Sequence, residues 1–96
     1  MPGDCILTLL DHGFQRGSGG DWYRDGDESH EGFVVDMTVE APADDGCPVL
    51  GMVSVENIHT DDYFRCHVSG KDTPELVERM ESAVEYIIGH WPVPKE

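Results

Sequence analysis

Three segments in the middle of the chain alternate between apolar and polar residues, and this alternation most constrains the fold. The first, Phe33–Ala41, places five apolar side chains on one face. The second, Val49–Ile58, alternates clearly in its second half, and the third, Tyr63–Ser69, alternates throughout. A period of two is typical of strands with one buried side and one solvent-facing side. The links between the segments are short, polar and turn-like, so we expect an antiparallel meander of three strands.

A long amphipathic helix is predicted after the meander. Thr73 can cap its first turn, and Pro74 suits its first position. Gly89 is a stop signal, and the prolines that follow it prevent continuation of the helix. An isolated helix is costly to nucleate, so its apolar stripe must be buried against the sheet. The apolar residues at helical spacing are Leu76, Val77, Met80, Ala83, Val84, Ile87, Ile88 and Trp91.

A fourth strand is expected near the start of the chain, where Cys5–Leu10 is short, apolar and bounded by glycines. Together these elements predict an α+β fold of two layers, in which an antiparallel sheet of about four strands packs on one C-terminal helix. The 96 residues are enough for one domain, 1–96, and not for two. Gly51, in the second strand of the meander, indicates a bulge or a close backbone contact.

The stretch from residue 11 to residue 32 is rich in glycine and aspartate and is unusually long for a loop. We interpret it either as a surface loop or extra hairpin, or as a loop that contacts a partner. Trp22 and Tyr23 suit a short edge strand, and Asp25 followed by Gly26 is typical of a turn. In a partner-contact loop the two aromatic residues are the expected anchors, because aromatic side chains dominate the energetics of interfaces.

The charge of the chain is strongly negative, since 20 acidic residues against 6 basic ones give a formal net charge of −14. Such a surface repels phosphates and anionic lipids, so direct nucleic-acid binding and attachment to an anionic membrane are excluded. Disorder is not expected, because 39% of the residues are hydrophobic and they keep strand and helix periods. The charge therefore indicates a basic protein partner, and the sequence leaves room for a homodimer.

The three cysteines, Cys5, Cys47 and Cys66, are odd in number and far apart in the sequence. This pattern favours free thiols in a reducing compartment. The apolar run near the start of the chain is too short to span a membrane, and the acids Asp4 and Asp11 on either side of it do not fit a signal peptide. We therefore expect a cytoplasmic protein.

No motif in the sequence indicates an enzyme or a cofactor site. Cys66 and His67 are adjacent, but neighbouring residues of a strand point to opposite faces and cannot act together. The five histidines lack the spacing of zinc ligands, and the acids of residues 21–31 lack the spacing of a calcium loop. The glycines at 17–20 are not followed by the lysine of a phosphate-binding loop. We expect no catalytic residue, no metal and no cofactor.

The remaining candidate is the acidic surface. The helix carries acids opposite its apolar stripe, the strands carry acids at outward positions, and residues 21–31 carry acids against one basic residue, Arg24. Acids on one helix face or one strand face are separated by distances of the order of those between phosphates along a nucleic-acid strand. The residues expected to bind a partner are Asp21, Trp22, Tyr23, Asp25, Asp27, Glu28, Glu31, Asp36, Glu40, Glu56, Glu75, Glu78, Glu81 and Glu85.

Two functions are consistent with this surface. In the first, the protein is a nucleic-acid mimic that occupies the basic site of a nucleic-acid-processing protein and excludes its substrate. Small acidic inhibitors, such as phage anti-defence proteins and nuclease immunity proteins, form a functional class that this profile is similar to. In the second, the protein is a non-catalytic accessory or structural protein whose acidity serves solubility or adaptation to high salt.

Overall fold

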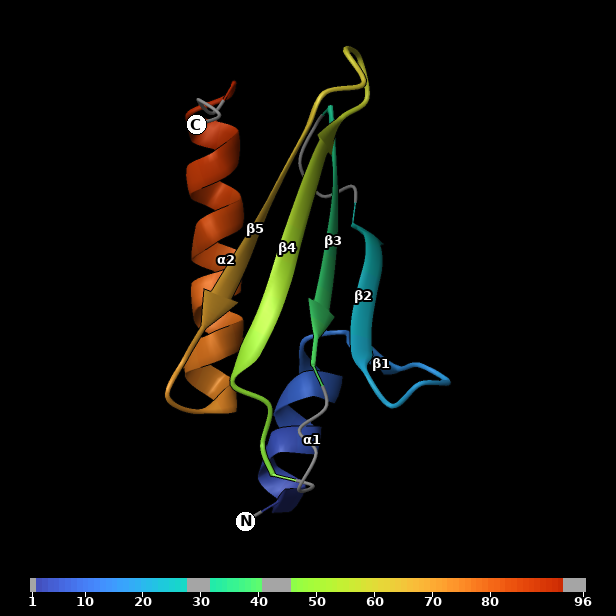
Figure 1. The fold of residues 1–96 in the computed structure, drawn as a ribbon, viewed down its shortest axis with the longest axis vertical. Helices are drawn as coiled ribbons and strands as arrows, with labels where there is room; N and C mark the ends of the chain where they lie inside the picture. Colours follow the sequence, from blue (N-terminus) through green and yellow to red (C-terminus); the bar gives the residue numbers. More distant parts are fainter. Residues whose placement is uncertain (1, 28–31, 41–45, 93–96) are drawn as a thin grey trace.

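The computed structural model describes residues 2–27, 32–40 and 46–92. They form an antiparallel sheet in the order β1-β2-β3-β4-β5, with α2 packed along one face and α1 at one end of the molecule (Figure 1). The α+β prediction is confirmed, with five strands rather than four. Neither helix of the described residues is long and apolar enough to cross a membrane. The elements are α1 (Pro2–Asp11), β1 (Gln15–Arg16), β2 (Trp22–Asp27), β3 (Phe33–Val39), β4 (Leu50–Asn57), β5 (Tyr63–Ser69) and α2 (Thr73–Gly89).

The three central strands confirm the predicted meander, since β3 pairs with β4 and β4 pairs with β5. Met37 and Val53 lie opposite each other in the register of β3 and β4, and both are buried in the core. Alternate residues of the same strands face the other side of the sheet. Gly51 makes the predicted close contact, because a Cβ there would lie 2.9 Å from the Thr38 carbonyl oxygen and 3.0 Å from Met80 Sδ.

Helix α2 spans the predicted residues, but its capping residue differs from the prediction. Asp72 is the N-cap, and its carboxylate accepts a 2.8 Å hydrogen bond from the Glu75 backbone N–H. Thr73 instead turns into the core, where its hydroxyl donates a 2.7 Å hydrogen bond to the Pro48 carbonyl. This buried hydrogen bond joins the start of α2 to the segment that leads into β4.

The strand predicted at Cys5–Leu10 is wrong, because this segment belongs to helix α1. The buried side chains Cys5 and Leu9 are four residues apart, which is the spacing of one helix face. Gly13 follows the helix with a φ of 85°, a conformation that glycine readily adopts after a helix C-terminus. An apolar run this short does not distinguish a strand from a helix, because too few residues are present to establish a period.

Much of the stretch 11–32 forms the extra hairpin that was one of its two interpretations. Strands β1 and β2 pair with each other, and β2 pairs with β3, so β2 lies one strand in from the edge. Trp22 is buried and belongs to the core. The turn predicted at Asp25 and Gly26 is wrong, because both residues lie within β2, where its pairing with β3 shifts register.

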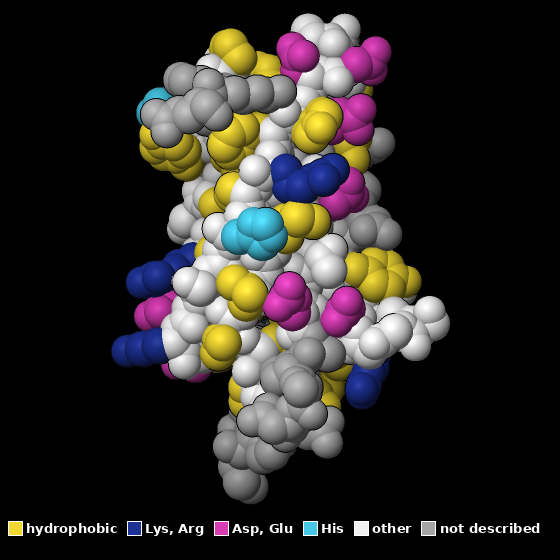
Figure 2. Space-filling view, in the orientation of Figure 1, with side chains coloured by type: hydrophobic (Ala, Val, Ile, Leu, Met, Phe, Trp, Pro, Cys, Tyr) yellow, Lys and Arg dark blue, Asp and Glu magenta, His cyan; other side chains and the backbone are white. Residues whose placement is uncertain are grey.

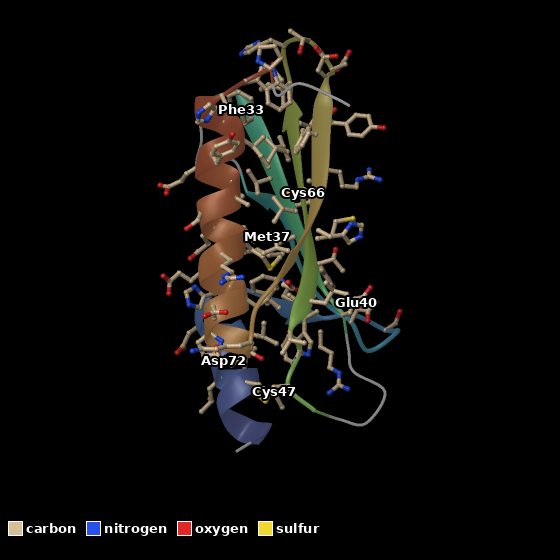
Figure 3. All side chains as sticks on the ribbon, turned by 60° about the vertical axis from the view of Figure 1, so that its left-hand side comes forward. Phe33, Met37, Glu40, Cys47, Cys66 and Asp72 are labelled. Atoms are coloured by element: carbon tan, nitrogen blue, oxygen red, sulfur yellow. A yellow bond between two sulfur atoms is a disulfide. The ribbon has the colours of Figure 1, made fainter. Side chains whose placement is uncertain are left out.

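Cys5 and Cys47 form a disulfide with a Cα–Cα distance of 5.7 Å. It links α1 to the segment before β4, at the end of the molecule shown below the sheet in Figure 3. The prediction of three free thiols is therefore wrong for two of them, and of the three cysteines only Cys66 is free. The odd number of cysteines did not indicate a disulfide, and its two members are 42 residues apart in the sequence.

A count of thiols tests this disulfide. The unreduced protein, unfolded in denaturant so that every thiol is accessible, is expected to react with one equivalent of a thiol reagent, because only Cys66 is free. After reduction, all 3 cysteines are expected to react. The variant Cys66→Ser is the control and should show no thiol before reduction. Three equivalents from the unreduced wild-type protein would contradict the pairing.

Candidate functional site

The acids predicted to bind a partner lie on two sides of the molecule. Four of them are on helix α2, whereas those of β3 and β4 face the side of the sheet that α2 leaves uncovered. In Figure 3, Met37 and Cys66 lie on the helix side of the sheet, and Glu40 lies on the opposite side. We call this opposite side the outer face. It consists of Tyr23, Val34, Asp36, Thr38, Glu40, Leu50, Met52, Ser54, Glu56, Tyr63, Arg65, His67 and Ser69.

The residues predicted from the loop are distributed differently. Asp21 directly precedes β2 and is exposed, and Tyr23 is partly buried on the outer face. Trp22 is only 8% exposed, so the prediction that it anchors a partner is wrong. Asp25 and Asp27 lie in β2. The predicted partner contacts Glu28 and Glu31 lie outside the described residues.

The strand register arranges the outer face in rows that cross the sheet. The central row runs from Tyr23 through Thr38 and Met52 to His67, and in the neutral form of the histidine it carries no charge. The next row contains Asp36, Ser54 and Arg65. A third row contains Val34, Glu56 and Tyr63.

The outer face is therefore mixed rather than uniformly acidic. Figure 2 looks onto this side of the molecule and shows acidic side chains separated by hydrophobic, basic and histidine side chains. The guanidinium of Arg65 lies 5.3 Å from the centroid of the Tyr63 ring, in a cation–π contact. Tyr63 itself is 51% exposed and stands at the edge of the sheet.

The acids of α2 fall into two classes. The carboxylate of Glu75 accepts a 3.0 Å hydrogen bond from the Lys71 backbone N–H and lies 3.6 Å from the guanidinium of Arg79. Glu75 is thus part of the structure at the start of the helix. By contrast, Glu78 and Glu85 are exposed on the side of α2 that faces away from the core.

Glu81 belongs to a polar cluster between α1, β2 and α2 that the sequence did not indicate. Its carboxylate lies 3.6 Å from the guanidinium of Arg24 and 3.7 Å from His12 Nδ1. The same guanidinium donates a 2.9 Å hydrogen bond to the His12 carbonyl and lies 5.5 Å from the centre of the Phe14 ring. Arg24 follows Trp22 by two residues and therefore shares the core-facing side of β2 with it. This alternation is the one sequence feature that could have indicated that Arg24 points toward the helices. Glu81 is therefore a structural residue.

The cluster gives a measurable prediction. Glu81→Gln is expected to lower the free energy of unfolding by about 0.5–1 kcal/mol, because the partly exposed pair with Arg24 is lost. The matched control is Glu85→Gln, which removes the same charge from the exposed side of α2 and should change stability by less than about 0.5 kcal/mol. Urea unfolding measures both values. Equal stabilities of the two variants would show that the cluster contributes nothing specific.

Cys66 and His67 lie on opposite faces of β5, as predicted. The side chain of Cys66 packs against the core, and that of His67 is exposed. Burial raises the pKa of the Cys66 thiol, which disfavours the reactive thiolate. Among the described residues, no group of three or more histidine, cysteine, aspartate or glutamate side chains is placed to hold a metal ion.

Comparison of this chain with family models, with curated proteins and with solved structures finds no match.

Proposed function

We propose that the protein is an acidic inhibitor that binds a basic nucleic-acid-processing protein and occupies its nucleic-acid site, as anti-defence and immunity proteins do. One observation supports this proposal above the others. Where burial is described, no carboxylate side chain is buried, whereas the guanidinium groups of Arg24, Arg65 and Arg79 are held in internal contacts. The carboxylates whose burial is described are therefore all at least partly accessible to solvent, and the formal charge of the chain is −14.

Electrostatics gives this charge a role in association. A strongly acidic surface attracts a basic cleft over roughly the Debye length, about 10 Å at 0.1 M salt, and accelerates encounter. Along α2, the exposed Glu78 and Glu85 are seven residues apart, which corresponds to about 10 Å of helix. This spacing is about three times the interval of about 3.4 Å between phosphates along one DNA strand, so the two carboxylates correspond to every third phosphate.

The proposal is tested by capture of the partner from the source cell at low salt, followed by mass spectrometry. A basic protein that binds or processes nucleic acid is expected to be retained and to elute as the salt concentration rises. The matched control is a protein with Glu78→Lys and Glu85→Lys, which keeps the fold because both residues point away from the core. Glu81 is left unchanged because it contacts Arg24. Retention of acidic or neutral proteins alone would contradict the proposal.

A second function is favoured by the spread of the acids over both sides of the molecule. In this alternative the protein is a non-catalytic accessory or structural protein, and its acids serve solubility or adaptation to high salt. The alternative predicts that the free energy of unfolding rises strongly toward molar salt, because screening removes repulsion among the carboxylates. It also predicts that no basic protein co-purifies at low salt.

A cytoplasmic location forms part of the inhibitor proposal, and the disulfide between Cys5 and Cys47 makes it testable. Structural disulfides are rare in reducing compartments and persist in oxidising ones. Alkylation of thiols at the moment of cell lysis would report the state of the pair in the cell. Paired cysteines in a cytoplasmic fraction would fit a transient or regulatory disulfide, whereas paired cysteines found only outside the cytoplasm would contradict the location.

A further inference from the structure

We infer that the partner docks on the outer face of the sheet, and that it presents a flat surface with arginine or lysine side chains around an aliphatic or aromatic centre. This inference rests on the proposed function, because it names the surface that an acidic inhibitor would use. It assigns the acids of α2 to long-range attraction rather than to contact.

The outer face is large enough to contribute most of a small interface. Its strands lie about 4.8 Å apart and rise about 3.4 Å per residue, so four long strands of about seven residues cover roughly 450 Å². Weak and transient complexes bury up to about 600 Å² per partner. The turns at the two ends of the face supply the remaining area. Among the described elements, α2 packs its buried side chains on the opposite side of the sheet and leaves this face to solvent.

The centre of the outer face has the composition of an interface core. Met52 and Tyr23 lie in the uncharged central row, and Tyr63 lies two rows away, beyond the row of Asp36, Ser54 and Arg65. Met52 and Tyr23 are partly shielded by their strand neighbours, so they lose less side-chain freedom on binding than residues of a mobile loop would. Methionine, tyrosine and arginine are enriched in interfaces, and tyrosine and arginine are frequent binding hot spots.

The ends of the outer face are acidic, and this charge defines the partner. Glu40 lies at one end, where its backbone N–H donates to the Leu50 carbonyl, and Glu56 lies opposite Val34 at the other end. Val34 in β3 and Glu40, the residue after β3, are six positions apart, which corresponds to about 20 Å of extended chain. The exposed Asp61 and Asp62, in the turn between β4 and β5, add charge beside Glu56. A complementary partner therefore carries basic groups about 20 Å apart, on either side of a centre that faces the uncharged central row and the row of Asp36, Ser54 and Arg65.

The exposed side of α2 lacks such a centre. Glu75 and Glu81 are engaged with neighbouring side chains, which leaves Glu78 and Glu85 as exposed acids of the helix. Tyr86 is exposed there, but its ring stacks on His90 at a centroid distance of 4.1 Å. A convex helix with two acids and one aromatic residue contributes attraction, but offers less flat apolar area than the sheet.

Two substitutions with the same change of net charge separate contact from attraction. Met52→Lys adds one positive charge at the centre of the outer face, and Glu78→Gln removes one negative charge from α2. The probes are two synthetic eight-residue peptides of equal charge, one alternating arginine with leucine and the other alternating arginine with glycine. Affinity is measured by fluorescence anisotropy, and the contact surface is mapped by amide chemical shifts of ¹⁵N-labelled protein.

We expect the arginine–leucine peptide to bind about tenfold more tightly than the arginine–glycine peptide and to shift amides of β3, β4 and β5. Met52→Lys should weaken this binding about tenfold, and Glu78→Gln less than twofold. Equal affinities for the two peptides, equal effects of the two substitutions, or shifts centred on α2 would overturn the inference. If Met52→Lys fails to fold by circular dichroism, Tyr63→Ala at the exposed sheet edge replaces it, with the same expected loss.

Failure of this inference is distinguishable from failure of the proposed function. If the captured basic protein is released by nucleic acid while Met52→Lys leaves its binding unchanged, the inhibitor role stands and the docking surface is wrong. If Met52→Lys abolishes binding of a captured protein that nucleic acid does not displace, the outer face is an interface but the inhibitor role is wrong.

Discussion

Replacing Leu76 with alanine is expected to lower the free energy of unfolding by about 2–5 kcal/mol. Leu76 is fully buried at the start of α2 and belongs to the core formed by the helix and the sheet. The backbone there is already in close contact with the preceding turn, since a Cβ on Gly70 would lie 2.6 Å from the Leu76 nitrogen. The chain therefore has little room to move and fill the cavity, which favours the upper half of this range.

Thermal and urea unfolding measure this effect. For a domain of this size, each kcal/mol corresponds to about 4–8 °C in Tm, so a decrease of roughly 15–40 °C is expected for the upper half of the range. Glu78→Ala is the control on the exposed side of the same helix and should stay within about 0.5 kcal/mol of wild type. A loss below about 1 kcal/mol for Leu76→Ala would contradict the packing of α2 on the sheet.

Association with the basic partner is expected to slow by about 10- to 1,000-fold as salt rises from about 0.01 M to about 1 M. Over this range the Debye length falls from about 30 Å to about 3 Å, so the acids attract the partner only at close approach. The dissociation rate should change much less, because contacts within the interface are shielded from added ions. Stopped-flow or surface-based kinetics measure the two rates separately.

The double variant Glu78→Gln with Glu85→Gln provides the control. It removes two exposed carboxylates from α2 and should reduce the dependence of the association rate on salt, with the dissociation rate unchanged. Association that is independent of salt in the wild-type protein would remove the electrostatic basis of the proposal, even if a complex forms. Such a result would indicate that apolar contacts alone stabilise the complex.

The strands and helix of residues 33–89 could be predicted because each combines a clear period with local end signals. Buried residues at every second position in β3 and β4 carry the strand signal, and the stripe from Leu76 to Ile87 carries the helix signal. The first 32 residues lack such a period. Helix α1 buries only Cys5 and Leu9 among its described side chains, and β1 has two residues, so neither has a pattern long enough to read.

The sequence predicted which side of the sheet the acids of the candidate site occupy, but it did not predict which side chains contact each other. Alternation along the chain placed Asp36, Glu40 and Glu56 on one side of the sheet, as the register of Asp36 and Glu56 and the position of Glu40 in Figure 3 confirm. The pairing of Glu81 with Arg24 depends on the approach of α2 to β2, which local patterns do not encode. Local patterns do not encode the disulfide either, because the fold brings together two cysteines that are 42 positions apart in the sequence.

The most direct test of the central claim is a competition measurement with the basic partner captured at low salt. The nucleic-acid-binding activity of this partner is measured with increasing amounts of the acidic protein and, separately, with increasing amounts of nucleic acid. We expect mutual exclusion: the acidic protein displaces nucleic acid, and an excess of nucleic acid restores binding in proportion to its concentration. A ternary complex containing the partner, the nucleic acid and the acidic protein would contradict the account.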